Sequence, residues 1–207
     1  MNIGIILAAG NSSRFDSETP KQLYHINGKE IIYHSIDTMS QSLDEIIVVS
    51  NSSCCDKIKT DAVVLINDVN CRLQSIKKAL DYIGNKKVSN IIIHDSARPF
   101  LTKDHIDNLL TSSKKFFYSQ YYLKLTNGFV KKTETGHEVV DRDQFIELCT
   151  PQIIDYSLFN FIFREYIDGP DSIACEFITM ANFFGIEYNL IEGYHKHLRK
   201  ITTINDV

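Results

Sequence analysis

The chain has 207 residues, of which 43% are hydrophobic and 23% are charged, and its formal net charge is −4. This length can bury the core of one ordinary domain, so we expect residues 1–207 to form a single domain. The slightly acidic balance excludes a general nucleic-acid surface, which is usually basic. No apolar run is long enough to cross a membrane.

Five cysteines are scattered along the chain without a CxxC spacing. An odd number with no paired spacing favours free thiols over a disulfide framework or a zinc site. The N-terminal run lacks a basic segment and leads directly into a strand pattern, so we expect no signal peptide. We therefore expect a cytoplasmic protein with no nucleic-acid partner and no membrane partner.

In chain order, four short apolar runs rich in Ile and Val predict strands buried on both faces: residues 3–8, 45–50, 62–66 and 90–95. Segments with helical spacing lie between them, notably at 29–43 and 71–84. Alternation of strand and helix implies right-handed βαβ units. The sequence therefore predicts an α/β fold with a Rossmann-like, doubly wound, mostly parallel sheet.

In such a sheet, ligands bind outside the carboxyl ends of the strands. The loops at 9–22, 66–75 and 94–100 each follow a predicted strand. We expect these three loops to meet at one rim, where their polar residues are the first candidates for a functional site.

The second half of the chain has a different pattern. Residues 116–140 contain Asn-Gly and Thr-Gly turn signals between aromatic and β-branched stretches, which indicates a projecting β-hairpin arm. An apolar arm on an α/β core needs a partner surface, so we expect it to form a homodimer. Helices at 155–166 and 172–184, a strand at 187–193 and a strand-like final segment complete the prediction.

The loop "LAAGNSSRFDSETPKQ" carries the first chemical signal. Ala8, Ala9 and Gly10 keep bulk away, so backbone N–H groups can approach a base, sugar or phosphate. Arg14 and Lys21 place two positive charges where nucleotidyl transfer needs them. The loop lacks both the GxGxxG and the GxxxxGK[ST] pattern. The residues alone leave open a nucleotide-binding loop and a solvated loop with incidental basic side chains.

The run "HDSARPF" (94–100) follows the fourth predicted strand. Asp95 is placed to meet a magnesium ion or a ribose hydroxyl. Arg98 either binds phosphate or pairs with Asp95 and braces the loop.

Other polar residues carry weaker signals. Arg142 follows the predicted arm and either reaches a neighbouring subunit's site or forms a surface ion pair with Asp141 or Asp143. His195 and His197 would share one face of a strand, but no third ligand for a metal is evident.

Taken together, these stretches resemble the cytidylyltransferases that act on small polyol phosphates. The family's branches use 2-C-methyl-D-erythritol 4-phosphate, in isoprenoid biosynthesis, or ribitol 5-phosphate. The match spans nearly the whole chain in the right order: Ala8-Ala9-Gly10, Arg14, Pro20-Lys21-Gln22, Arg72 with Ser75, the HDxxRP run at 94–99, Val140-Asp141-Arg142, Thr150-Pro151-Gln152 and Lys200-Ile201-Thr202.

The resemblance implies a nucleotidyltransferase-type fold and the transfer of CMP from CTP to the acceptor, with release of pyrophosphate. It implies that Arg14, Lys21 and Lys200 stabilise the charged transition state. It also implies that Mg²⁺ is carried mainly by the triphosphate; Asp95 is a candidate ligand from its position after a predicted strand. The implied CTP-binding residues are Ala8, Ala9, Gly10, Ser75 and Ser96; the implied polyol-phosphate-binding residues are Asp95, Thr150, Lys200 and, from the other subunit, Arg142.

The sequence contains residues that favour each of the two acceptors. Ala97 and the run 139–142 favour methylerythritol phosphate, whereas Ser96, Phe100 and the run 200–203 suit ribitol phosphate equally well. We expect methylerythritol phosphate. The alternatives are a nucleotidyltransferase for another sugar or polyol phosphate, used in surface-polysaccharide synthesis, and a catalytically degenerate nucleotide-binding member of the fold.

Two departures from the family pattern stand out. Where the family has two glycines, this chain has Asp68 and Val69, followed by Asn70 and Cys71. The family's late acidic motif has no clean counterpart, and either Asp171 or Glu176 could replace its acid.

Overall fold

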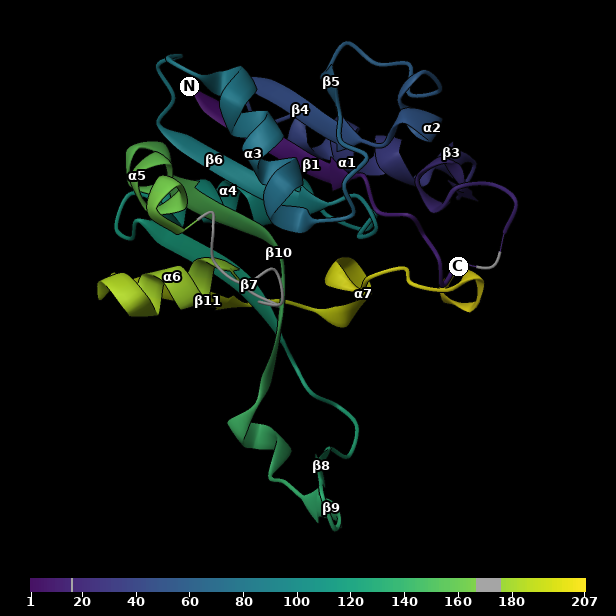
Figure 1. Ribbon diagram of the computed structural model, residues 1–207, viewed down its shortest axis with the longest axis vertical. Coiled ribbons are helices and arrows are strands. Elements are labelled where there is room, and N and C mark those ends of the chain that lie inside the picture. The colour runs from purple at the N-terminus through teal and green to yellow at the C-terminus, as the bar shows by residue number, and fades with distance from the viewer. Residues whose placement is uncertain (16, 167–175) are drawn as a thin grey trace.

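A computed structural model describes residues 1–15, 17–166 and 176–207 of the chain (Figure 1). Its centre is a seven-stranded sheet with the order β11-β7-β10-β6-β1-β4-β5. Parallel pairing joins β5 to β4, β4 to β1 and β1 to β6, whereas β10 is antiparallel to both of its neighbours. The strands are β1 (Asn2–Ala8), β4 (Glu45–Ser50), β5 (Val63–Ile66), β6 (Asn90–Asp95), β7 (Tyr118–Lys124), β10 (Ile146–Asp155) and β11 (Tyr188–Glu192).

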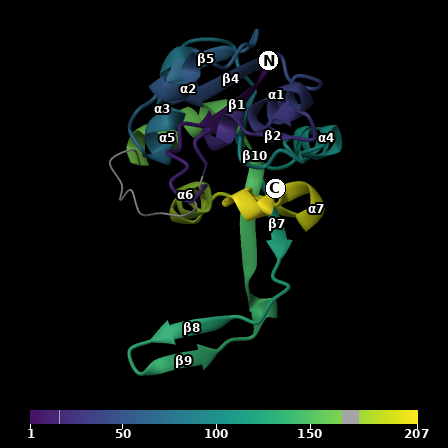
Figure 2. The ribbon, with the colours of Figure 1, turned by 90° about the vertical axis from the view of Figure 1, so that its right-hand side faces the viewer.

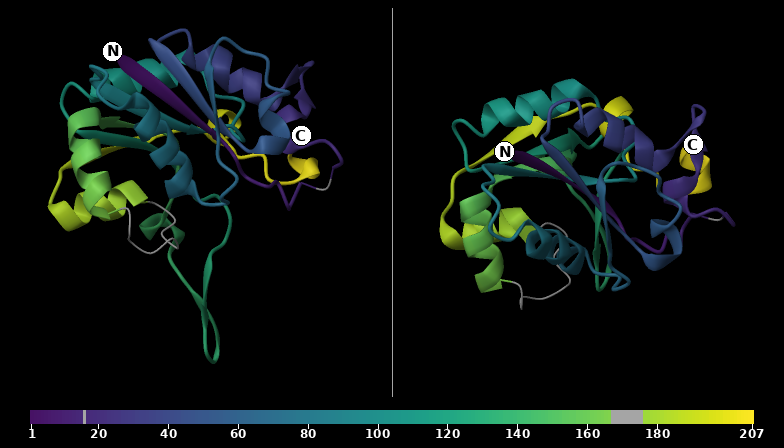
Figure 3. Two further views of the ribbon diagram at one scale, coloured as in Figure 1. Left: turned by 45° about the horizontal axis from the view of Figure 1, so that its top comes forward. Right: turned by 90° about the horizontal axis from the view of Figure 1, so that it is seen from above.

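Helices cover both faces of this sheet, as the doubly wound prediction requires (Figure 3). Alternate residues of β1 point to opposite faces because the side-chain period of a strand is two. Ile3 and Ile5 pack in the cluster with α3, α5 and α6, whereas Ile6 and Ala8 pack with α1 and α4. The helices are α1 (Ile31–Met39), α2 (Ser52–Cys55), α3 (Arg72–Ile83), α4 (Lys103–Ser112), α5 (Tyr156–Tyr166), α6 (Glu176–Phe184) and α7 (His195–Leu198).

Gly4 allows α1 to lie close against the sheet. A Cβ atom at this position would meet side-chain atoms of Ile46, Met39 and Leu43 at 2.8–2.9 Å. Only a residue without a side chain fits there, so the centre of β1 is shaped by the helix that covers it.

The sequence-predicted strands at 3–8, 45–50, 62–66 and 90–95 are confirmed to within one residue at each end. The helical segments at 29–43 and 71–84 contain α1 and α3. A small hairpin, β2 (His25–Ile26) and β3 (Lys29–Glu30), precedes α1. Among the described residues, no helix is both long and apolar enough to cross a membrane.

The segment 116–140 divides between the body and an arm. Its first part, β7, lies inside the central sheet between β10 and β11, and Tyr118, Tyr121 and Leu123 are buried there. The chain leaves the body after Lys124, forms the hairpin β8 (Val130–Thr133) and β9 (Gly136–Val139), and returns through η2 (Arg142–Gln144) to β10. Figures 1 and 2 show this arm extending away from the sheet. The projecting part therefore begins later and ends later than the sequence indicated.

The C-terminal region differs more from expectation. The prediction of a strand-like run around Lys200 is wrong: one turn of helix, α7, precedes an irregular segment that ends in η3 (Ile204–Asp206). The Asp206 carboxylate accepts hydrogen bonds from the backbone N–H groups of Thr202 and Thr203, each at 2.7 Å. These bonds satisfy the backbone locally instead of through a neighbouring strand. The candidate acid Asp171 lies outside the described residues, as does the side chain of Glu176.

Candidate active site

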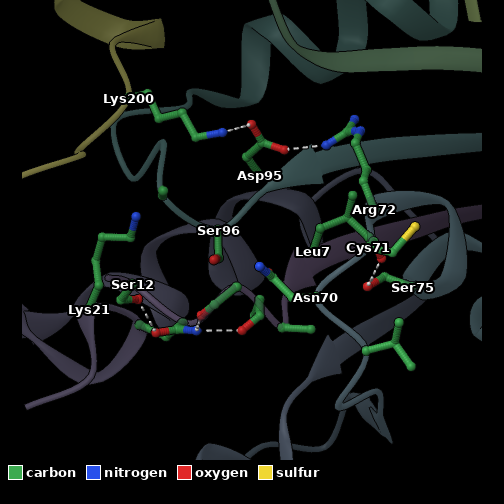
Figure 4. A pocket seen from close by; sticks show the side chains of 16 residues that line it. Leu7, Ser12, Lys21, Asn70, Cys71, Arg72, Ser75, Asp95, Ser96 and Lys200 are labelled. Atoms are coloured by element: carbon green, nitrogen blue, oxygen red, sulfur yellow. Dashed lines mark hydrogen bonds and ion pairs between the residues drawn. The ribbon is translucent and has the colours of Figure 1, made fainter. Parts of the chain in front are cut away.

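A cavity of about 230 Å³ opens at the carboxyl ends of β1 and β6 (Figure 4). Its walls are residues 7–12 with Lys21 and Gln22, residues 69–72 with Ser75, residues 95–97, and Lys200. These include the three loops that the sequence places at one rim. The fourth wall comes from the C-terminal segment, which lies beside them only in the folded chain.

The first wall is built from small residues. Ala8, Ala9 and Gly10 line the cavity directly. A Cβ atom at Gly10 would meet nothing within 4 Å, so packing within the chain does not require glycine there. The space is instead open to a ligand that approaches the backbone closely.

The second wall is the N-terminal turn of α3. Its first backbone N–H groups have no partner within the helix, and the helix dipole favours negative charge there. The Ser75 hydroxyl donates to the carbonyl oxygen of Cys71 at 3.2 Å and accepts a hydrogen bond from the Asn67 amide at 2.9 Å. Asn67 also accepts a hydrogen bond from the backbone N–H of Val69 at 3.2 Å. Ser75 thus stabilises the loop before the helix, in addition to lining the cavity.

Asp68 and Val69, which replace the two glycines of the family pattern, contact different parts of the structure. The Asp68 carboxylate accepts a hydrogen bond from the backbone N–H of Ser52 at 2.8 Å, at the start of α2. Val69 lines the cavity and is 57% exposed. The acidic side chain is therefore held by a neighbouring helix, and an apolar side chain faces the ligand space.

Asp95 is the electrostatic centre of the third wall. Its carboxylate lies 2.6 Å from Arg72 Nη1, 2.9 Å from Lys200 Nζ and 3.6 Å from Arg98 Nε. Burial alone would raise the pKa of Asp95, but Arg72, Lys200 and Arg98 outweigh it and hold that pKa well below 3.8. Asp95 is therefore an anion at every physiological pH.

Arg98 and Thr150 support this wall from behind. Arg98 is 5% exposed, and its Nη1 donates a hydrogen bond to the carbonyl oxygen of Leu198. The backbone N–H of Ile201 donates to the carbonyl oxygen of Ala97 at 2.8 Å. Together these bonds fix the segment that carries Lys200. Of the two roles that the sequence left open for Arg98, the structure agrees with bracing.

Thr150 lies in β10, next to Asp95 but outside the cavity wall. It is 4% exposed, and its Oγ1 accepts a hydrogen bond from the backbone N–H of Asp95 at 3.0 Å. In this chain alone, Thr150 positions Asp95. Ser96, in contrast, lines the cavity itself.

The predicted cations fall into three groups. Lys21 and Lys200 line the cavity, whereas Arg14 is exposed and lies outside its wall. Burial, followed by repulsion from Lys200 and from Arg14, lowers the pKa of Lys21 below its usual 10.5, so these three charges act on one another. Arg142 lies on the arm, where its Nη1 donates to the carbonyl oxygen of Thr126 at 2.7 Å.

Metal binding rests on few protein groups. Within the described ranges, no three His, Cys, Asp or Glu side chains cluster so as to hold a metal ion, and Asp95 is the one carboxylate among the residues that line the cavity. His195 and His197 lie on the single turn of α7, not on a strand. This donor set suits an ion such as Mg²⁺, which commonly binds one or two carboxylates together with substrate phosphates.

Three residues of the site had no role assigned from sequence. Arg72 pairs with Asp95, Asn67 anchors the loop before α3, and Gln22 contacts the opening loop. Arg72 and Gln22 lie within the family motifs, and Asn67 directly follows a predicted strand. Motif membership was the available signal for the first two, and their partners became visible only in the fold.

Comparison with known proteins agrees with this geometry. Residues 3–207 match the family model described as "IspD: 2-C-methyl-D-erythritol 4-phosphate cytidylyltransferase". The enzyme of that name from Thermotoga neapolitana is 26% identical over 200 residues, which cover 93% of this chain and 88% of the relative. The one from Clostridium acetobutylicum is 29% identical over 222 residues, covering 100% and 94%.

Solved structures show the same fold. The 4-diphosphocytidyl-2C-methyl-D-erythritol synthase from Anaerococcus prevotii superposes with a TM-score of 0.82 at 21% identity, covering 100% of this chain and 94% of that one. The bifunctional IspDF from Campylobacter jejuni gives a TM-score of 0.81 at 23% identity, covering 100% of this chain and 53% of that one. Since the family model spans almost the whole sequence, the chain belongs to the 2-C-methyl-D-erythritol 4-phosphate cytidylyltransferase family.

Proposed function

We propose that the cavity binds CTP against its first wall and the N-terminus of α3, and that Lys21 and Lys200 stabilise the reacting phosphates. The observation that carries this proposal is the meeting of Lys21, Lys200 and Arg72 in one cavity with a small-residue loop. Positive charge and approachable backbone N–H groups are what a triphosphate needs. Arg14 is exposed and close enough to lower the pKa of Lys21, so it adds positive charge near that lysine.

The reaction of the family joins CTP and 2-C-methyl-D-erythritol 4-phosphate. In the proposed step, a phosphate oxygen of the acceptor attacks the α-phosphorus of CTP. A new P–O bond forms as the bond from the α-phosphorus to the bridging oxygen breaks, and pyrophosphate leaves with the negative charge. The attacking oxygen is already anionic, so positioning and positive charge carry the catalysis and no strong base is needed.

Mg²⁺ is the metal that we propose for this reaction, held chiefly by the triphosphate. Both oxygens of Asp95 already pair with cations, so the protein supplies at most a single carboxylate to the ion. When bound, Mg²⁺ neutralises part of the phosphate charge. The role of Asp95 toward the protein is to hold Lys200 and Arg72 at a fixed spacing beside the phosphates.

We propose that the arm joins two copies of the chain and delivers Arg142 to the partner's acceptor site. Phe129, Val130, Val139 and Phe145 are 41–86% exposed on the arm. Such an apolar surface on a slender projection is typical of an interface. Arg142 lies in η2, between the β8–β9 hairpin and β10, with an exposed guanidinium, the group best suited to hold a phosphate in a bidentate manner.

The proposed location is the cytoplasm. Cys54, Cys55 and Cys149 are free thiols. Free thiols are typical of a reducing compartment.

The direct test is pyrophosphate release by the full chain with Mg²⁺, CTP and an acceptor panel: methylerythritol 4-phosphate, ribitol 5-phosphate, erythritol 4-phosphate and glycerol 3-phosphate. The panel is repeated with ATP, GTP and UTP, with EDTA, and with Lys21→Met as the matched inactive control. We expect release with methylerythritol phosphate and CTP alone. Turnover with ribitol phosphate instead would overturn the assignment of methylerythritol phosphate as the acceptor. CTP binding without turnover would identify a catalytically degenerate member of the fold.

A further inference from the structure

The side chain of Gln22 is the most highly connected group of the opening loop. It lies in η1 (Lys21–Leu23), directly after Lys21, and is 3% exposed. Its Nε2 donates to the carbonyl oxygens of Ala8 at 2.5 Å and Gly10 at 3.0 Å, and its Oε1 accepts from the Ser12 hydroxyl at 3.2 Å. Dashed lines beside Ser12 in Figure 4 mark these bonds. One amide thus contacts three residues of the first wall.

These bonds determine which end of each peptide group faces the glutamine. The single cis peptide bond among the described residues is Thr150–Pro151, so the groups that follow Ala8 and Gly10 are trans. In a trans peptide group, the N–H points opposite to the C=O. With both carbonyl oxygens directed at Gln22, the N–H groups of Ala9 and Asn11 point away from it.

This orientation has an electrostatic consequence for an entering anion. An unbonded carbonyl oxygen at a phosphate site repels the phosphate, whereas an N–H group attracts it. The hydrogen bonds from Gln22 occupy two carbonyl oxygens of the cavity wall, so these oxygens repel an entering phosphate less. The backbone of residues 8–12 is then favourable to negative charge, in addition to the cation that Lys21 contributes to the same wall.

Gln22 also contacts Ser12, a left-handed residue of this loop. Ser12 has φ = 53°, a conformation that a non-glycine residue adopts at a cost of about 1 kcal/mol. The Ser12 hydroxyl is held by Gln22, and the Ser12 carbonyl oxygen accepts a hydrogen bond from the backbone N–H of Phe15 at 2.8 Å. The glutamine therefore stabilises the turn as well as the two peptide groups before it.

We propose that Gln22 is a positioning residue for the nucleotide: its amide orients the backbone of residues 8–12 so that this wall binds the triphosphate of CTP. The inference rests on the proposed function, because it takes the cavity as the CTP site. Glutamine suits the role because its amide nitrogen provides two donors and its oxygen one acceptor. Glutamate lacks the donors, and an aliphatic side chain lacks both.

The test compares Gln22→Met with Gln120→Met in the full-length enzyme. Gln120 is also 3% exposed, but it lies in β7, outside the cavity wall, and donates to the carbonyl oxygen of Cys149 at 3.3 Å. It therefore controls for the loss of a buried amide. KM for CTP, KM for the acceptor, kcat, melting temperature and hydrogen exchange of residues 8–12 are measured for both variants.

We expect Gln22→Met to raise KM for CTP about tenfold or more, since two hydrogen bonds that orient the loop are lost. The KM for the acceptor should change by less than about twofold, and exchange at residues 8–12 should accelerate. Gln120→Met should leave both KM values within about twofold of wild type. An unchanged KM for CTP in a folded Gln22→Met enzyme, or an equal rise in both KM values, would overturn the proposal.

A second variant keeps the proposal testable if Gln22→Met folds poorly. Gln22→Glu preserves the shape and the acceptor for Ser12 but removes both donors. Its KM for CTP should exceed that of wild type and fall toward it as the pH is lowered, because a protonated carboxyl group donates one hydrogen bond. A KM for CTP equal to that of wild type at neutral pH contradicts the role. If wild type itself binds no CTP, the proposed function fails instead, which calorimetry on the unmodified enzyme distinguishes.

Discussion

The ammonium group of Lys200 lies 2.9 Å from Oδ2 of Asp95, although 105 residues separate them in the sequence. The other carboxylate oxygen is 2.6 Å from Arg72 Nη1. Asp95 therefore keeps two positive side chains of the cavity at defined positions where, without it, they would repel each other. A triphosphate that enters this cavity meets charges that are already in place, so little reorganisation is needed during the reaction.

Replacement of Asp95 by Asn should reduce both stability and turnover. The buried guanidinium of Arg98 would lose its carboxylate, and breaking such a pair costs about 3–5 kcal/mol. Lys200→Met is the matched control, because the Lys200 side chain is 42% exposed and its removal should cost less than about 1 kcal/mol while still lowering kcat. Chemical denaturation and steady-state kinetics measure the two effects. Equal stability losses in the two variants would show that Asp95 does not act through the buried arginine.

The pH dependence of the same variant follows from the sign of the Asp95 shift. The pKa of Asp95 in the folded chain is below the usual 3.8, so the ionised carboxylate stabilises the fold above that value. The stability difference between wild type and Asp95→Asn should stay constant from about pH 8 to about pH 5 and shrink only as the pH falls below about 4. Denaturation curves at several pH values measure this. A stability difference between the two proteins that already declines near pH 6 would contradict a pKa of Asp95 below 3.8.

Lys21→Met should lower kcat more than it raises KM for CTP. The positive charge of Lys21 is needed most when negative charge gathers in the transition state, so a kcat loss of about 100-fold or more is expected with a smaller change in KM. Burial and repulsion from Lys200 and Arg14 lower the pKa of Lys21, so wild-type activity should decline on the alkaline side before pH 10.5. Kinetics across pH on both enzymes measure these effects. Losses of similar size in kcat and KM would argue for ground-state binding alone.

Mixing two inactive variants tests whether Arg142 serves the partner's site. Arg142→Ala and Lys21→Met should each be nearly inactive alone. In a one-to-one mixture, about a quarter of all sites should regain both residues, because half of the dimers are mixed and each contains one intact site. Pyrophosphate release after subunit exchange measures this recovery. No recovery from stable mixed dimers would place the action of Arg142 within its own chain.

The dimer itself depends on the arm in this scheme. Replacing residues 128–139 with a short turn removes the β8–β9 hairpin and most of the exposed apolar side chains of the arm. Light scattering should then give the monomer mass, with a melting temperature that falls only slightly, because the central sheet is untouched. Substitution of exposed Lys131 by Ser provides a control that should keep the dimer mass. A dimer that survives the hairpin deletion would require another interface.

His94 provides a second pH test, on stability alone. Burial lowers its pKa from 6.5 to about 4, and its ring Nε2 lies 3.1 Å from the carbonyl oxygen of Arg98. The unfolded chain therefore binds a proton between pH 6.5 and about 4 that the folded chain does not, so stability falls as the pH is lowered through this window. His94→Gln should remove this contribution, which reaches about 1.4 kcal/mol per pH unit. Identical slopes for wild type and variant in this range would mean that His94 is already protonated when folded.

The sequence alone was sufficient for the first half of the sheet and for the loops at its rim. The runs at 3–8, 45–50, 62–66 and 90–95 are short, continuous and rich in β-branched residues, and such patterns depend on neighbours a few positions away. The motif residues Ala8, Ala9, Gly10, Lys21 and Ser96 line the cavity for the same reason, because each ends a strand, directly follows one or lies in the loop after one.

The tertiary structure decided the placement of segments and the long-range partners of side chains, which local sequence patterns do not specify. The aromatic stretch 118–124 is amphipathic in a way that suits an arm, yet contacts with β10 and β11 place it in the core. The segment that carries Lys200 has strand-like composition, but the bonds from Arg98 to Leu198 and from Ile201 to Ala97 hold it as an irregular wall. Asp95 meets Arg72 and Lys200, and Gln22 meets Ala8 and Gly10, because folding brings distant segments together. Sequence spacing identified which residue types were available, and long-range packing selected their partners.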